Sequence, residues 1–148
     1  MKVVRIGVFE TNSSSVHTVT FSNVGLQDSN LPMKDGYVIA HYGEFGRNRQ
    51  TFNSQEDKLS YLVTCCYYLN GFSDYDIETS YNFRQIEDVL CNYIPGCQGI
   101  KIAENSPEPE IDHQSIPEFD IEIVNIWDED ALINFIFNEN ILLKTDYD

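Results

Sequence analysis

The chain has 148 residues, with 9 lysines and arginines against 24 aspartates and glutamates, which gives a net charge of −15 and an isoelectric point near 4.3. Proteins neutralise phosphate backbones and anionic membranes with basic side chains, so this charge argues against both as direct partners. The hydrophobic content of 42% excludes charge-driven disorder. The length favours a single domain over residues 1–148.

Two strands joined by a hydroxyl-rich loop are predicted at the start of the chain. Residues 3–9 alternate β-branched side chains with others, which is typical of a strand. The polar run 11–15 interrupts this pattern, and residues 16–21 resume it. A third strand is predicted over 37–42, between two glycines.

Two helices are predicted in the middle of the chain. Ser54 stands before two acidic residues, which is typical of an N-cap and a first helical turn. The apolar residues that then follow at helical spacing are Leu59, Leu62, Val63, Cys66 and Leu69. A second helix is predicted over 83–94, where Pro95 stops it, and a short strand over 98–103.

The last third is predicted to be an acidic loop followed by a strand, a helix and a strand. Residues 104–118 hold three of the five prolines and five acidic side chains, which favours a loop. Residues 119–148 then contain an alternating strand at 119–124, a helix capped by Asp128 and a closing strand at 141–143. Because helices and strands do not alternate regularly, we expect an α+β domain, with a small mixed or antiparallel sheet and two to three helices.

The negative charge is concentrated in this last third. Residues 1–103 form a nearly neutral body, with 11 acidic and 8 basic side chains and a net charge of −3. Residues 104–148 hold 13 acidic side chains and one basic side chain, a net charge of −12. Such asymmetry favours a dedicated interaction surface.

The sequence predicts a cytoplasmic protein with free thiols. Its start lacks the apolar run of a secretory signal, and no stretch of about 18 apolar residues could span a membrane. In a reducing compartment we expect unpaired cysteines, and their spacing matches no zinc motif, so no metal and no cofactor is expected. The cysteines are Cys65, Cys66, Cys91 and Cys97.

The densest polar cluster lies at residues 10–17. It combines a carboxylate, three hydroxyls and an imidazole, the groups that nucleophilic catalysis requires. The residues are Glu10, Ser13, Ser14, Ser15 and His17. A turn whose side chains bond to nearby backbone amides explains the same composition, and ligand binding by a polar loop is a third interpretation.

The run R-I-G-V-F-E-T-N-S-S-S-V-H at residues 5–17 resembles the opening of a group of small proteins carried by phages and mobile elements of Gram-positive bacteria. Those proteins begin with R-x-G-x-F-E-T-N-S-S-S-x-H. Residues 112–115 and 135–138 look like later motifs of the same group. The resemblance implies a phage or mobile-element origin and no particular reaction. In size, charge and setting, such proteins are similar to anti-CRISPR and other anti-defence inhibitors.

His113 lies in the acidic, proline-rich stretch. With His17, Glu10 and a serine it would form an acid–base pocket if these segments met in space. Two-histidine phosphoesterases carry two histidines, each followed at the second position by Ser or Thr. The run that begins at His113 fits this pattern, whereas the run that begins at His17 has no hydroxyl at that position. Only half of the signature is therefore present. A solvent-facing histidine among acids is the other interpretation.

Three acids at Asp74, Asp76 and Glu78 imitate the first ligands of a calcium-binding loop. The sixth and twelfth positions are Thr79 and Gln85, where that loop requires Gly and Glu. We therefore interpret this segment as a solvated turn.

A row of acids is predicted on one face of the strand at 119–124. Side chains two residues apart on a strand lie about 6.6–6.8 Å apart, close to two steps of phosphate rise along one DNA strand. The row consists of Glu118, Asp120 and Glu122. It could imitate nucleic acid toward a basic groove, although acids on a half-exposed strand also serve solubility.

The leading functional interpretation is therefore a non-enzymatic inhibitor. It would bind a basic, nucleic-acid-handling surface of a bacterial defence nuclease, such as a CRISPR effector, in the host cytoplasm. The expected partner-binding residues are Glu118, Asp120, Glu122, Trp127, Asp128, Glu129 and Asp130. The alternative is a small enzyme that acts on a nucleotide or another phosphorylated molecule through the serine-rich loop, with His17 and His113 as acid and base. A structural phage protein is a third possibility, and the oligomeric state is left open.

Overall fold

The computed structural model describes residues 3–6, 15–22, 25–46, 50–71, 76–111 and 124–147. Within these ranges it contains three α-helices, one short 3-10 helix and nine strands in small sheets. This arrangement confirms the predicted α+β class.

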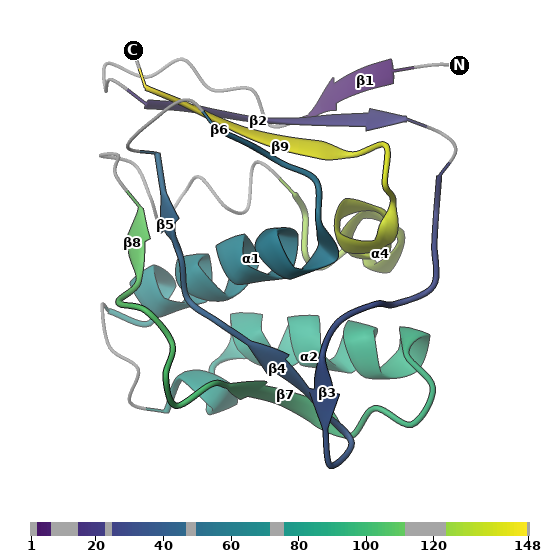
Figure 1. Ribbon diagram of the computed structural model, residues 1–148, viewed down its shortest axis with the longest axis vertical. Helices are drawn as coiled ribbons and strands as arrows, with labels where there is room; N and C mark the ends of the chain where they lie inside the picture. Colours follow the sequence, from purple (N-terminus) through teal and green to yellow (C-terminus); the bar gives the residue numbers. More distant parts are fainter. Residues whose placement is uncertain are drawn as a thin grey trace.

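The largest sheet joins both ends of the chain. It has four antiparallel strands in the order β1, β2, β9 and β6. Their bounds are Val3–Ile6, Ser15–Ser22, Leu142–Tyr147 and Gln50–Phe52. The two strands predicted at the start and the closing strand are thereby confirmed, and β9 lies between β2 and β6 (Figure 1).

Two smaller sheets bring distant segments together. In the first, β4 (Tyr37–Ala40) pairs antiparallel with β3 (Met33–Lys34) and parallel with β7 (Gly99–Ile102). In the second, β5 (Glu44–Phe45) pairs parallel with β8 (Glu110–Ile111). The strands predicted near 37–42 and 98–103 are confirmed, whereas the two-residue strands were not predicted. Strand β8 lies within the stretch that the sequence marks as an acidic loop.

Two of the three helices begin at the caps that the sequence predicts, and the other begins two residues before its predicted start at residue 83. Helix α1 (Gln55–Leu69) is capped by Ser54, whose hydroxyl accepts a hydrogen bond of 3.1 Å from the Asp57 amide. Helix α2 (Tyr81–Tyr93) ends just before Pro95, and the 3-10 helix η1 (Ile77–Thr79) precedes it. Helix α4 (Glu129–Phe137) follows the predicted cap at Asp128.

Helix α1 occupies the centre of the fold. Figure 1 shows the four-stranded sheet as the upper layer, α1 and α4 beneath it, and α2 with the three-stranded sheet on the opposite side. Every residue from 58 to 66 is buried, including Lys58, Ser60 and Thr64. Burial therefore extends well beyond the apolar positions seen in the sequence, because other elements cover this helix on more than one side.

Two polar side chains on α1 form hydrogen bonds with the backbone of neighbouring loops. Lys58 is fully buried, and its Nζ donates hydrogen bonds to the carbonyl oxygens of Asn138 (2.9 Å) and Ile141 (3.2 Å). Burial lowers the pKa of Lys58 from 10.5 to about 8. Gln55 both donates to and accepts from the backbone of residues 28–30. The first two turns of α1 thus hold the turn between α4 and β9 and the loop that precedes β3.

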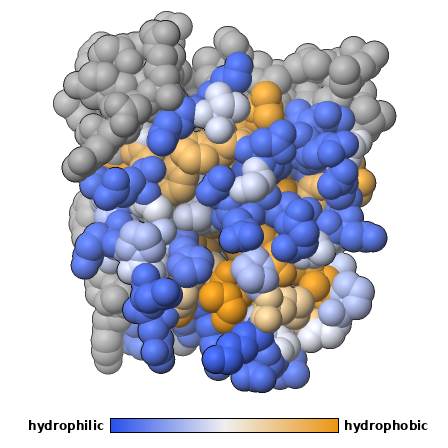
Figure 2. Space-filling model, viewed as in Figure 1, coloured by the Kyte–Doolittle hydropathy of each residue, from blue (hydrophilic) through white to orange (hydrophobic). Residues whose placement is uncertain are grey.

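On the face shown in Figure 2, the coloured residues are mostly hydrophilic, with smaller apolar areas between the polar side chains. Among the described residues, the large apolar side chains that stay exposed are Leu26, Met33, Tyr81 and Trp127. No helix in the described part of the chain is both long enough and apolar enough to cross a membrane.

Candidate acidic binding cavity

A cavity of about 630 Å³ opens between two segments that are distant in the sequence. One wall is residues 76–79, which contain η1, and the other is the chain from 102 to 109, between β7 and β8. Tyr42, which follows β4, completes the lining. We call this site the acidic cavity.

Backbone and hydroxyl contacts fix the η1 wall. Asp76 adopts the left-handed conformation, with φ 57°, which aspartate tolerates better than most residues. Its carbonyl oxygen accepts hydrogen bonds from the amide (3.0 Å) and the hydroxyl (2.8 Å) of Thr79. Ile77 turns inward and is buried, so Asp76 and Glu78 are left exposed on the outer side.

The opposite wall is fastened to the core at both ends. The amide of Ala103 donates to the carbonyl oxygen of Ala40 at 2.9 Å, and the amide of Glu110 donates to that of Gly43 at 3.0 Å. Between them, the hydroxyl of Ser106 accepts a hydrogen bond of 2.7 Å from the Tyr42 amide. Two prolines in this wall restrict its backbone further.

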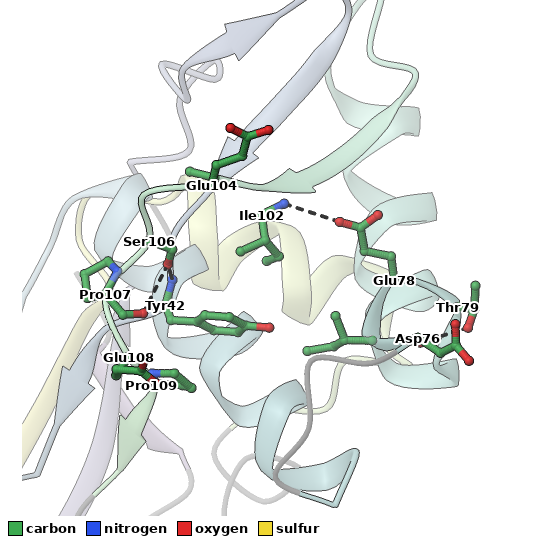
Figure 3. A pocket seen from close by; sticks show the side chains of 12 residues that line it. Tyr42, Asp76, Glu78, Thr79, Ile102, Glu104, Ser106, Pro107, Glu108 and Pro109 are labelled. Atoms are coloured by element: carbon green, nitrogen blue, oxygen red, sulfur yellow. Dashed lines mark hydrogen bonds between the residues drawn. The ribbon is translucent and has the colours of Figure 1, made fainter.

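The lining of the cavity combines apolar side chains with acidic ones. Figure 3 shows the ring of Tyr42 reaching between the two walls, with Ile102 on one side of it. The ring is buried and lies edge-on to Tyr67, with ring centroids 5.6 Å apart. The four acidic residues of the lining are Asp76, Glu78, Glu104 and Glu108.

One contact joins the two walls directly. The Glu78 carboxylate accepts a hydrogen bond of 3.5 Å from the backbone amide of Ile102 (Figure 3). Among the described residues that line the cavity, none is a lysine, arginine or histidine. This described lining therefore contains four acidic side chains and no basic one.

This composition suits a cationic group. The methylene stem of a lysine or arginine packs on apolar surface while its charged head stays among polar groups. Carboxylates in a partly enclosed site bind a guanidinium through paired, charge-assisted hydrogen bonds. The volume lies in the range of about 300–1,000 Å³ that is usual for ligand pockets. The acidic cavity can thus accept basic side chains from a partner.

Four of the partner-binding residues expected from the sequence lie together at the start of α4. Trp127 is 53% exposed, and Asp128, Glu129 and Asp130 are exposed beside it. Asp128 has a structural role there, because its carboxylate accepts a hydrogen bond of 3.2 Å from the Ala131 amide. Acids in a first turn also stabilise the helix dipole, so this cluster is partly explained by helix formation.

The other expected site residues are not brought together by the described structure. Ser15 and His17 lie on β2, where they pair in register with Tyr147 and Thr145 of β9. The residues that lie outside the described ranges are Glu10, Ser13, Ser14, His113, Glu118, Asp120 and Glu122. The acid–base pocket and the acidic row therefore stay predictions.

The acidic cavity itself was missed by the sequence reasoning. Asp76 and Glu78 were assigned to a solvated turn, and Glu104 and Glu108 to an acidic loop. Each assignment fits its own segment, since all four side chains are exposed. The only available signal was the presence of two short acidic segments on either side of the second helix and the strand that follows it.

Neither a metal-binding cluster nor a similarity to known proteins identifies a ligand for the acidic cavity. Within the described ranges, no group of three or more histidine, cysteine, aspartate or glutamate side chains could hold a metal ion. Comparison with protein-family models, with curated proteins and with solved structures found no match. The functional argument therefore depends on the chemistry of the site.

Proposed function

We propose that the protein is a phage-type anti-defence inhibitor that binds a basic, nucleic-acid-handling surface of a bacterial defence nuclease. The observation that carries the proposal is the acidic cavity, whose lining includes four acidic residues from two segments that are distant in the sequence. A surface that normally binds phosphates presents lysines and arginines, which are the side chains this cavity accepts.

The charge distribution supports the same class of partner. Glu104 and Glu108 belong to the last third of the chain, which carries −12 of the total charge of −15. A strongly negative region accelerates encounter with a positive surface and disfavours wrong partners. The exposed ring of Trp127, beside three acids, offers an aromatic contact of the kind that often dominates binding energy.

The proposal predicts salt-sensitive capture of a basic protein from host lysate. Immobilised protein should retain a nucleic-acid-binding protein at about 0.1 M salt and release it at about 1 M, where the screening length falls from about 10 Å to about 3 Å. The measurement is mass spectrometry of both eluates. Beads coated with polyglutamate control for adsorption to negative charge alone.

Two results would contradict the proposal. One is the absence of any retained protein beyond those on the polyglutamate beads. The other is a partner that stays bound at about 1 M salt, because apolar contacts would then dominate the interface.

A further inference from the structure

Two cysteines at the end of α2 face each other closely. Cys91 lies in the last turn of the helix, and Cys97 follows the turn after it. Their sulfur atoms are 3.0 Å apart, and both side chains are half-buried, within reach of small solutes. Cys65 and Cys66, by contrast, are both buried in α1.

The backbone between the two cysteines is fixed. The Ile94 amide donates to the carbonyl oxygen of Leu90 at 2.8 Å, and the Cys97 amide donates to that of Ile94 at 3.2 Å. Gly96 has a φ of 74°, which glycine adopts without strain. The next residue, Gln98, donates from its amide to the carbonyl oxygen of Gly36 at 2.7 Å. The turn therefore presents both sulfurs in one place before any bond forms.

The sulfur separation is close to that of a covalent bond. A disulfide bond is about 2.05 Å long, so the sulfurs need to approach by about 1 Å. Rotation of a cysteine side chain about χ1 moves its sulfur while the backbone stays in place. Free thiols at this separation are the reduced state of a pair that oxidation can join.

The two thiols differ in their surroundings. Burial, followed by the hydrogen bond and charge of Cys97 and then by the charges of Glu87 and Asp88, raises the pKa of Cys91 to about 12. Cys91 thus keeps its proton at neutral pH. Cys97 lies between the exposed residues Gly96 and Gln98, whereas Cys91 follows the buried Leu90. Cys97 is therefore assigned the first attack, since the attacking thiol has to be reached from solvent.

We propose that Cys91 and Cys97 form a reversible redox site whose substrate is a low-molecular-weight disulfide. The Cys97 thiolate attacks one sulfur of that disulfide, forms a mixed disulfide and releases one small thiolate. The Cys91 thiol then gives its proton to solvent, and its sulfur attacks that of Cys97 and releases the second small thiolate. Two protein thiols are oxidised by two electrons, and one small disulfide is reduced to two thiols.

The new bond would fasten the end of α2 to the connection that leads to β7, which is the parallel neighbour of β4. This connection is residues 94–98, and Cys97 lies near its end. Closing this short loop restricts the unfolded chain and resists fraying of the last helical turn. The redox state of the medium would thereby set the rigidity of this end of the molecule.

The site is tested by equilibrating the native, full-length protein with mixtures of glutathione and glutathione disulfide. After alkylation and tryptic digestion, both cysteines lie in one peptide, 85–101, whereas Cys65 and Cys66 lie in 59–84. We expect peptide 85–101 to lose two hydrogens and escape alkylation, while 59–84 stays reduced. A synthetic peptide of residues 85–101 in the same buffers provides the unfolded reference.

The fold should favour the bond over the unfolded reference. We expect the oxidation equilibrium constant of the native protein to exceed that of the synthetic peptide at least about tenfold, because the sulfurs are already adjacent. An equal or smaller constant in the native protein would overturn the proposal. A stable glutathione adduct on Cys97 in wild-type protein would overturn it as well.

Single variants separate the roles of the two thiols. Cys91→Ser should stop at a glutathione adduct on Cys97, because no second thiol resolves it. Cys97→Ser should form an adduct on Cys91 at least about tenfold more slowly, since burial keeps that thiol protonated. Equal rates in the two variants would show that Cys97 is not the attacking thiol.

Discussion

Lys58→Met is expected to remove a rise in stability that the wild-type protein shows as the pH increases from about 8 to about 10.5. The folded state lowers the pKa of Lys58 to about 8, whereas the unfolded chain keeps it near 10.5. Between these values the unfolded state binds a proton that the folded state does not, so a higher pH favours folding. A shift of this size corresponds to about 3 kcal/mol.

The effect is measured as the difference between two curves. The free energy of unfolding is determined by denaturant titration at several pH values for the wild type and for Lys58→Met. The difference, wild type minus variant, should increase by about 3 kcal/mol across this range. Subtraction also removes the opposite contribution of Cys91, whose raised pKa lowers stability above about pH 9.

A matched control is Lys34→Met, at an exposed lysine of β3. This variant should follow the pH dependence of the wild type. Parallel curves for the wild type and Lys58→Met would contradict the account of Lys58 as a buried cation held by two carbonyl oxygens.

Neutralising the acidic cavity is expected to weaken binding of the basic partner about 100-fold. The variant combines Asp76→Asn, Glu78→Gln, Glu104→Gln and Glu108→Gln, which keep the shape of each side chain and remove four charges. At roughly 0.7 kcal/mol for each partly exposed ion pair, four pairs contribute about 3 kcal/mol. The dependence of the dissociation constant on salt should flatten in parallel.

A second variant separates the effect of charges in the cavity from the effect of the protein's total charge. It removes four exposed acids that do not line the cavity, through Asp28→Asn, Glu44→Gln, Asp88→Asn and Glu139→Gln. Both variants have the same net charge, so only the position of the lost charges differs. Calorimetric titration of the purified partner should show a change of less than about tenfold for this control. Equal losses in both variants would mean that the cavity is not the binding site.

The helices were predictable because their signals are local. Ser54 caps α1 and Asp128 caps α4 through contacts within one turn, and Pro95 ends α2 by its ring. The extent to which α1 is buried was not predictable from such local signals. Lys58 looks like a solvent-facing residue in the sequence, and only the carbonyl groups of a distant turn make its burial possible.

The short strands were harder to predict from the sequence than the helices. Two residues cannot display alternation, so β3, β5 and β8 left no periodic signal. One of them had a different signal, because Asp35 and Gly36 both have positive φ and join β3 to β4 in a two-residue hairpin turn. An Asp-Gly pair is a strong hairpin marker and would have predicted this turn.

The candidate site depends on tertiary structure more than the helices do. Its two acidic walls are separated in the sequence by α2 and β7, and the parallel pairing of β7 with β4 brings the second wall next to Tyr42. Composition could predict that the protein carries excess negative charge. Only the fold shows that four of these acidic residues line one cavity.

The measurement that tests the central claim most directly is competition between this protein and duplex DNA for the purified partner. The apparent dissociation constant of the complex is determined by fluorescence titration at increasing concentrations of DNA. If the protein occupies the nucleic-acid surface, the apparent constant should rise linearly with DNA concentration, without a plateau. An apparent constant that stays unchanged at saturating DNA, with all three components in one complex, would contradict the account.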